Sequence, residues 1–104
     1  MTRDELRFLA RHRYPVVQNE TVAHGEIVYP YIREIKVVYA SEEEERRGYP
    51  TERIAVSVAD KNGHSYTECL MRDLRIPSDE EAVLHALPGV NATQMINDLR
   101  RLRS

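Results

Sequence analysis

Residues 51–71 read TERIAVSVADKNGHSYTECLM, and this stretch decides the fold of the chain. Two runs that alternate apolar residues with small or polar ones flank the four residues 60–63, DKNG. Asn-Gly between two alternating runs is the strongest short-range signal for a β-hairpin, because both residues tolerate the positive φ of a tight turn. The stretch therefore predicts two antiparallel strands.

Two registers of this hairpin are compatible with its turn chemistry, and they bury different side chains. A two-residue loop at Asn62-Gly63 places Lys61 opposite His64, Val56 opposite Cys69 and Arg53 opposite Arg72. A type I turn over residues 60–63 places Asp60 opposite His64, Val58 opposite Tyr66 and Ile54 opposite Leu70. We favour the second register, because Asp and Gly suit its first and fourth turn positions and because the first opposes two arginines. Its defect is that Glu68 faces Val56 on the apolar side, and a slip of one residue exchanges the two sides.

Length and composition predict one ordinary globular domain spanning residues 1–104. The chain is 41% hydrophobic and 31% charged, and its net charge of −2 gives no overall attraction to nucleic acid or to an anionic membrane. It has no apolar run near the roughly 20 residues that span a bilayer, and its amino terminus lacks the apolar core of a secretion signal. The single Cys69 cannot form an internal disulfide, so we expect a cytoplasmic protein that does not bind membranes.

Capping signals predict the helices. Ser or Thr followed three residues later by Glu occurs at Thr2/Glu5, Ser41/Glu44 and Ser78/Glu81, and Asn91/Gln94 is a looser form of the signal. They predict a helix over residues 3–12, a short solvent-exposed helix that Gly48 ends, and a C-terminal helical hairpin. The first helix of that hairpin ends at Pro88-Gly89, and the second carries apolar residues at helical spacing over residues 92–102.

Further strands are predicted on both sides of residues 41–48. Residues 33–39 alternate and place Ile35, Val37 and Tyr39 on one side, as a partner for the hairpin. Val16-Val17 starts a short strand that Asn19-Glu20 turns, and residues 74–76 are extended. Residues 26–39 are also extended, and Pro30 either breaks this run or places it at a sheet edge. The predicted fold is therefore α+β, an antiparallel sheet of three or four strands with the C-terminal helical hairpin packed on one face.

No residue pattern indicates an enzyme. Asp60, His64 and Ser65 are the residue types of an acid, a base and a nucleophile, but a hairpin tip is exposed and such residues are ordinary there. His12, His24, His64, His85 and Cys69 show none of the spacings of a metal site. The chain also lacks the glycine-rich loops that hold nucleotide phosphates. We expect no catalytic, metal-binding or cofactor-binding residues.

Two interaction hypotheses remain. The leading one is a non-enzymatic accessory protein that contacts an unidentified protein partner. Tyr29 and Tyr31, on either side of Pro30, could supply that interface, and the edge strand near residues 26–31 could pair with a second copy or with another protein. The alternative is nucleic-acid binding by arginines of the first and last helices, namely Arg3, Arg7, Arg11, Arg13, Arg100, Arg101 and Arg103. The acidic residues 79–81 oppose that alternative, because they would repel phosphate.

Residues 49–71, YPTERIAVSVADKNGHSYTECLM, resemble small uncharacterised proteins encoded on bacterial conjugative transposons. The resemblance covers about the middle third of the chain and has no diagnostic motif. It implies an accessory role in the biology of a mobile genetic element, and it carries over no catalytic or binding residue.

Overall fold

A computed structural model describes residues 1–19, 25–60 and 62–104, with Ser65 and Tyr66 described by their backbone alone. In chain order the elements are α1 (Arg3–Arg11), β1 (Val16–Gln18), β2 (Ile27–Tyr29), β3 (Ile32–Tyr39), α2 (Glu42–Arg46), β4 (Glu52–Ala59), β5 (Ser65–Leu70), the 3-10 helix η1 (Met71–Asp73), β6 (Leu74–Arg75), α3 (Asp79–His85) and α4 (Ala92–Arg103). The predicted α+β class is confirmed.

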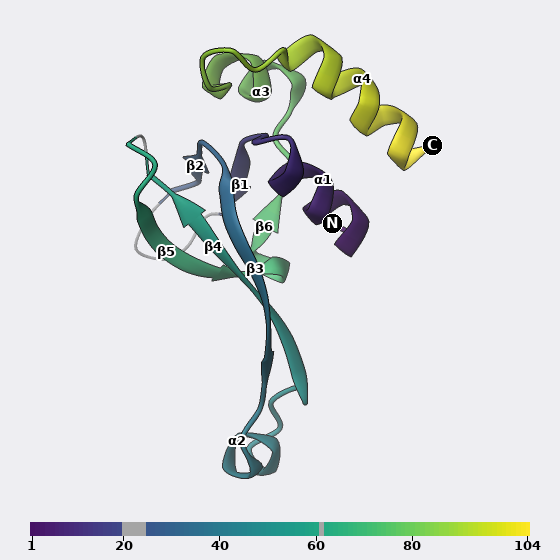
Figure 1. The fold of residues 1–104 in the computed structure, drawn as a ribbon. Helices are drawn as coiled ribbons and strands as arrows, with labels where there is room; N and C mark the ends of the chain where they lie inside the picture. Colours follow the sequence, from purple (N-terminus) through teal and green to yellow (C-terminus); the bar gives the residue numbers. More distant parts are fainter. Residues whose placement is uncertain (20–24, 61) are drawn as a thin grey trace.

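The six strands form two antiparallel sheets of three strands each (Figure 1). One sheet has the order β2-β1-β6, and the other has the order β3-β4-β5. The strands predicted at Val16-Val17, at residues 33–39 and at residues 74–76 are present, although the predicted turn at Asn19-Glu20 extends outside the described residues. A single core joins the sheets and helices.

The predicted helix caps are all present. In each of the three capping boxes the Ser or Thr hydroxyl accepts a hydrogen bond from the third helical residue, and that residue's Glu carboxylate accepts one from the capping backbone. Asn91 likewise accepts from the backbone of Gln94, at 3.1 Å. Each box uses backbone donors that would otherwise lack an intrahelical partner, so these short helices begin at defined residues.

The hairpin contains both predicted registers, one on each side of a β-bulge. At the turn, the Asp60 N–H donates to His64 O at 2.9 Å and Gly63 has φ +80°, as the type I turn requires. Between the pairs Ala59↔Ser65 and Val58↔Thr67 the register shifts by one, so the backbone of Tyr66 is the extra residue. Beyond the bulge the strands follow the other register. The predicted pairs Val58 with Tyr66 and Ile54 with Leu70 are therefore wrong, and the predicted Lys61 contact lies outside the described residues.

The bulge removes the defect of each register. Cys69 now lies opposite Val56 in the core, and Glu68 lies opposite Ser57 on the other face, where its carboxylate accepts from Lys36 Nζ at 3.1 Å. The opposition of Arg53 and Arg72 does not arise, because β5 ends at Leu70 and η1 begins at the next residue. One inserted residue thus keeps both the turn chemistry and an apolar core face.

The C-terminal helices α3 and α4 contact each other, as a helical hairpin does, and α4 also contacts α1. Ala82 of α3 and Ile96 and Leu99 of α4 belong to the core that holds the strand residues. Helix α1 contacts β3. Helix α1 therefore lies between β3 and α4, and the C-terminal pair adds apolar side chains to the same core.

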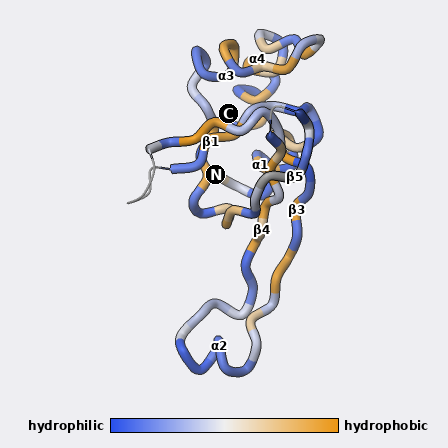
Figure 2. The backbone as a smooth tube through the Cα atoms, turned by 90° about the vertical axis from the view of Figure 1, so that its left-hand side faces the viewer, coloured by the Kyte–Doolittle hydropathy of each residue, from blue (hydrophilic) through white to orange (hydrophobic). Residues whose placement is uncertain are grey.

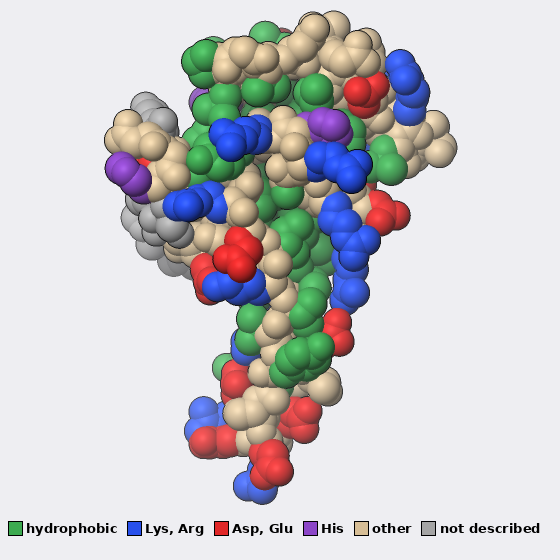
Figure 3. Space-filling model, viewed as in Figure 1, with side chains coloured by type: hydrophobic (Ala, Val, Ile, Leu, Met, Phe, Trp, Pro, Cys, Tyr) green, Lys and Arg blue, Asp and Glu red, His purple; other side chains and the backbone are tan. Residues whose placement is uncertain are grey.

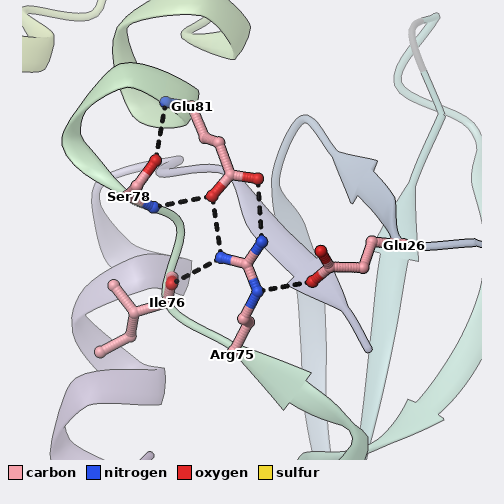
Figure 4. A network of polar contacts seen from close by, with 5 residues as sticks. All are labelled: Glu26, Arg75, Ile76, Ser78 and Glu81. Atoms are coloured by element: carbon pink, nitrogen blue, oxygen red, sulfur yellow. Dashed lines mark hydrogen bonds and ion pairs between the residues drawn. The ribbon is translucent and has the colours of Figure 1, made fainter. Parts of the chain in front are cut away.

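Arg75 joins three separate segments through its guanidinium (Figure 4). It donates two hydrogen bonds to the Glu81 carboxylate of α3, at 2.8 and 2.9 Å, and one to Glu26, at 2.7 Å. The same Glu81 carboxylate accepts from the Ser78 backbone at 2.9 Å. These bonds lower the pKa of Glu81 to about 2, with the bonds from Arg75 as the largest cause.

The outer halves of β3 and β4 leave the rest of the molecule as a two-stranded ribbon with α2 at its tip (Figures 1 and 2). We call residues 36–54 the arm and the remaining described residues the head. The arm accounts for the elongated shape of the molecule, whose principal extents are 46 × 31 × 23 Å.

Candidate functional site

The arm exposes an apolar face that continues from the core of the head. On β3 and β4 this face starts with buried Val58 and Val56, and continues through half-buried Ile35 and Ile54. Farther out, Val37 is 44% exposed and Tyr39 is 69% exposed. Figure 3 shows hydrophobic side chains running from the head onto the arm on the side that faces the viewer. A face that is core at one end and exposed at the other is typical of an interaction surface.

The arm also has an open backbone edge along β3. In the sheet order β3-β4-β5, β3 lies at the edge, and Figure 1 shows no other described element beside its outer half. The Ala40 N–H donates to Thr51 O at 2.9 Å, one pair beyond the strands. Because hydrogen-bonded pairs alternate along an antiparallel ladder, Ile35, Val37 and Tyr39 direct their backbone groups away from β4. These groups can pair with another strand.

The tip of the arm is held to the ribbon by Arg53 of β4. Its Nη2 donates to the Glu44 carboxylate at 3.1 Å, and its guanidinium lies over the Tyr49 ring, 5.7 Å from the ring centroid. The Arg53 Nε is buried and has no hydrogen-bond partner among the described residues. Hydrogen bonding to the Ser41 backbone is the largest cause of a lowered pKa at Glu44. Helix α2 is therefore a fixed acidic tip.

The two tyrosines predicted as a protein interface lie in the head, and the structure separates their roles. Tyr29 is 4% exposed, and its hydroxyl donates to Gln18 Oε1 at 2.7 Å, so its ring belongs to the core and cannot contact a partner. That prediction was wrong for Tyr29, because β2 directs the side chain inward. Tyr31 is half-buried, with the Arg13 guanidinium 5.1 Å from its ring centroid and its hydroxyl 3.4 Å from Gly63 O. Strand β2 is an edge strand, as predicted for this segment.

The predicted basic patch is partly assembled. Helices α1 and α4 do meet, but five of the seven arginines are paired with carboxylates: Arg3 with Glu52, Arg7 with Asp4, Arg100 with Asp79, Arg101 with Asp98 and Arg103 with Glu5. Arg13 follows α1, and its guanidinium lies over the Tyr31 ring. Within the described part of the chain, Arg11 has no carboxylate at ion-pair distance. The interspersed carboxylates lower the positive potential that a phosphate backbone needs.

At the hairpin tip, Asp60 is engaged in the turn and His64 is exposed, while the Ser65 side chain lies outside the described part of the structure. The Asp60 Oδ1 accepts from the backbone N–H of Asn62 and of His64, both at 2.9 Å, so this carboxylate stabilises the turn. The imidazole of His64 is exposed, with Nδ1 3.8 Å from Asp60 Oδ2. Among the described residues, no group of three His, Cys, Asp or Glu could hold a metal ion.

Cys69 lies in the core, and burial raises the pKa of its thiol. A raised thiol pKa disfavours the reactive thiolate, so the side chain acts as a small core residue, as predicted. No helix within the described ranges has the length and apolar character to cross a membrane.

Comparison of the chain with protein-family models, with curated proteins and with solved structures gives no match. The alternation of Ile35, Val37 and Tyr39 was visible in the sequence, but it did not show that their common face leaves the core. Tyr39 and Tyr49 are both exposed and both belong to the arm. Neither was predicted as an interface residue.

Proposed function

We propose that this protein is a small non-enzymatic accessory protein that binds another protein chain through its arm. The observation that carries the proposal is the exposed apolar face of Val37 and Tyr39 beside an open strand edge. Main-chain groups at such an edge supply affinity, and the alternate side chains supply specificity. A cytoplasmic location and a role in a mobile genetic element belong to the same proposal. They rest on the single cysteine and on the resemblance of residues 49–71.

Site-specific photo-crosslinking in cells tests the proposal. A photoreactive amino acid replaces Tyr39 in one variant and Leu84 in the control. Leu84 is an exposed apolar residue of α3, 78% exposed, and lies in the head. We expect discrete adducts from position 39 and none from position 84. An adduct of twice the chain mass identifies a second copy, and any other discrete mass identifies a different protein. Equal or absent adducts at both positions would contradict the proposal.

Nucleic-acid binding is the second candidate, and the contact between α1 and α4 favours it. Its arginines would contact phosphates, so binding should weaken steeply as salt increases. A gel-shift at about 50 and 200 mM salt tests this. Binding at the lower salt that disappears at the higher salt, and that Arg11→Ala weakens, would support it. The absence of a shift at both concentrations removes it.

A further inference from the structure

We propose that the partner of the arm is a second copy of this chain, with the two β3 edges paired antiparallel about Val37. The inference rests on the proposed function and names its partner. Three independent features of the arm support it: the register that its edge permits, the side chains that this register brings together, and the charges at its two ends.

The first feature is the register. A twofold axis through an antiparallel edge pairs each residue with a residue of the other copy, and the paired numbers have a constant sum. Centring on Val37 pairs Val37 with its own copy and Ile35 with the copy's Tyr39. Both pairs use backbone groups that already point outward from the sheet. Centring on Lys36 would oppose two lysines, and centring on Ile35 would oppose Val37 and Arg33.

The second feature is apolar complementarity. Residues 35, 37 and 39 share one face of β3, so pairing about Val37 joins the exposed apolar faces of the two arms into one. On this face of β3, Val37 and Tyr39 are exposed side chains. Cross-strand pairs of aromatic with β-branched residues stabilise a sheet, and Tyr39 opposite Ile35 is such a pair.

The third feature is charge. Antiparallel arms place the tip of each copy beside the head of the other, next to the start of β3. The tip carries the four glutamates 42–45. Glu42 and Glu43 pair with Arg46 and Arg47, and Glu44 pairs with Arg53. Glu45 is exposed and has no cation at ion-pair distance among the described residues. At the head, Arg33 and Arg11 are exposed and have no carboxylate at ion-pair distance among the residues described. Figure 3 shows Lys and Arg side chains in the region of α1, on the same side as the apolar face of the arm. The unpaired carboxylate of Glu45 therefore lies at the end of the arm that meets the unpaired cations of the other head.

Sedimentation equilibrium of the purified full chain measures this association. We expect a monomer–dimer equilibrium with a limiting mass of twice 12.1 kDa. Val37→Lys opposes two ammonium groups at the axis and removes two buried valines, so it should raise the dissociation constant about a hundredfold. Leu84→Lys is the matched control, since it also puts lysine at an exposed apolar position, and it should dimerise like the parent chain. Circular dichroism confirms that both variants are folded.

Cysteine pairing tests the register directly. In a hydrogen-bonded antiparallel pair the two Cα atoms are about 5.5 Å apart, within the range that a disulfide bridges. Val37→Cys should therefore oxidise to a covalent dimer under a mild oxidant such as oxidised glutathione. Two thiols lose their hydrogens and form one S–S bond, while the oxidant is reduced to two thiols. Leu84→Cys should form no covalent dimer, although its side chain is more exposed and its non-covalent association is that of the parent chain. The parent chain, whose single Cys69 is buried, gives the background level of oxidation.

A parent chain that stays monomeric up to about 0.5 mM would overturn the inference, as would a dimer that Leu84→Lys disrupts and Val37→Lys leaves intact. If the purified chain is monomeric but position 39 gives adducts with another protein in cells, this inference fails and the proposed function stands. If neither dimer nor adduct forms, both fail.

Discussion

Glu81 is a single carboxylate that joins helix α3 to Arg75 of the neighbouring strand β6 and, through Arg75, to Glu26. It accepts two hydrogen bonds from Arg75 of β6, which also bonds to Glu26, and a further one from the Ser78 backbone. The Glu81 and Arg75 side chains are 29% and 34% exposed, so water screens their attraction only in part. The sequence identified Glu81 as a helix cap. Its second role follows from the tertiary position of Arg75, which no local signal specifies.

The lowered pKa of Glu81 makes stability depend on pH. The pKa is about 2 in the folded chain and 4.5 when unperturbed, so ionised Glu81 stabilises the fold above pH 4.5. This contribution is lost as the pH falls from 4.5 through 2. With allowance for solvent screening it amounts to about 1–2 kcal/mol. Glu81→Gln should lower the free energy of unfolding by that amount at pH 7, with the difference shrinking toward pH 2. Urea denaturation at several pH values measures it.

The control for this prediction is Glu80→Gln on the same helix. Glu80 is exposed, and within the described residues its carboxylate has no ion-pair partner. Its replacement should leave the free energy of unfolding nearly unchanged at every pH. A Glu81→Gln deficit that stays constant from pH 7 to pH 2 would show that the ion pair does not carry the effect.

At the scale of elements, the β4–β5 hairpin depends on the backbone conformation of Gly63. Its φ of +80° is unfavourable for any side chain, and a Cβ there would lie 3.0 Å from the Tyr31 hydroxyl. Gly63→Ala should therefore lower the free energy of unfolding by about 1–2 kcal/mol. Chemical denaturation followed by circular dichroism measures this change. Gly25→Ala is the matched control, because a Cβ at Gly25 meets no atom within 4 Å. Equal effects of the two substitutions would contradict the role of the turn.

The elements themselves were largely predictable, because their signals are local. Capping boxes, the DKNG turn and strand alternation each act within a few residues, and each is found where predicted. The bulges at Tyr66 and at Arg33 were not predicted. A bulge is a compromise between the turn and the core face, and neither register taken alone reveals it. The candidate site was missed for a related reason, since alternation shows which side chains share a face but not what covers that face.

At the scale of the whole molecule, the arm is linked to the head by the exposed ion pairs Arg3–Glu52 and Lys36–Glu68, but its outer part adds no described residue to the core. Among the described residues, the core contains none from 36–53, whereas α1, α4 and the inner halves of β3 and β4 all contribute to it. The contacts that order the tip are its own: the Ser41 cap, the Arg53–Glu44 pair and the Tyr49 ring. The head should therefore unfold as a unit whose stability owes little to the tip.

Replacing residues 41–50 by Asn-Gly tests this independence. Ala40 and Thr51 are hydrogen-bonded across the ribbon, so they can flank a two-residue type I′ turn that closes the shortened arm. The head should keep its fold, and the free energy of unfolding should change by no more than about 1 kcal/mol, because no core residue is removed and the lost ion pair is close to the surface. Denaturation monitored by circular dichroism gives the stability, and amide hydrogen exchange shows whether β4 and β5 keep their protection. A shortened chain that unfolds without a cooperative transition would show that the tip is part of the folding unit. If the head keeps its fold without the tip, the fold does not require the arm. The exposed apolar face of Val37 and Tyr39 is then explained by the binding of another chain, as we propose.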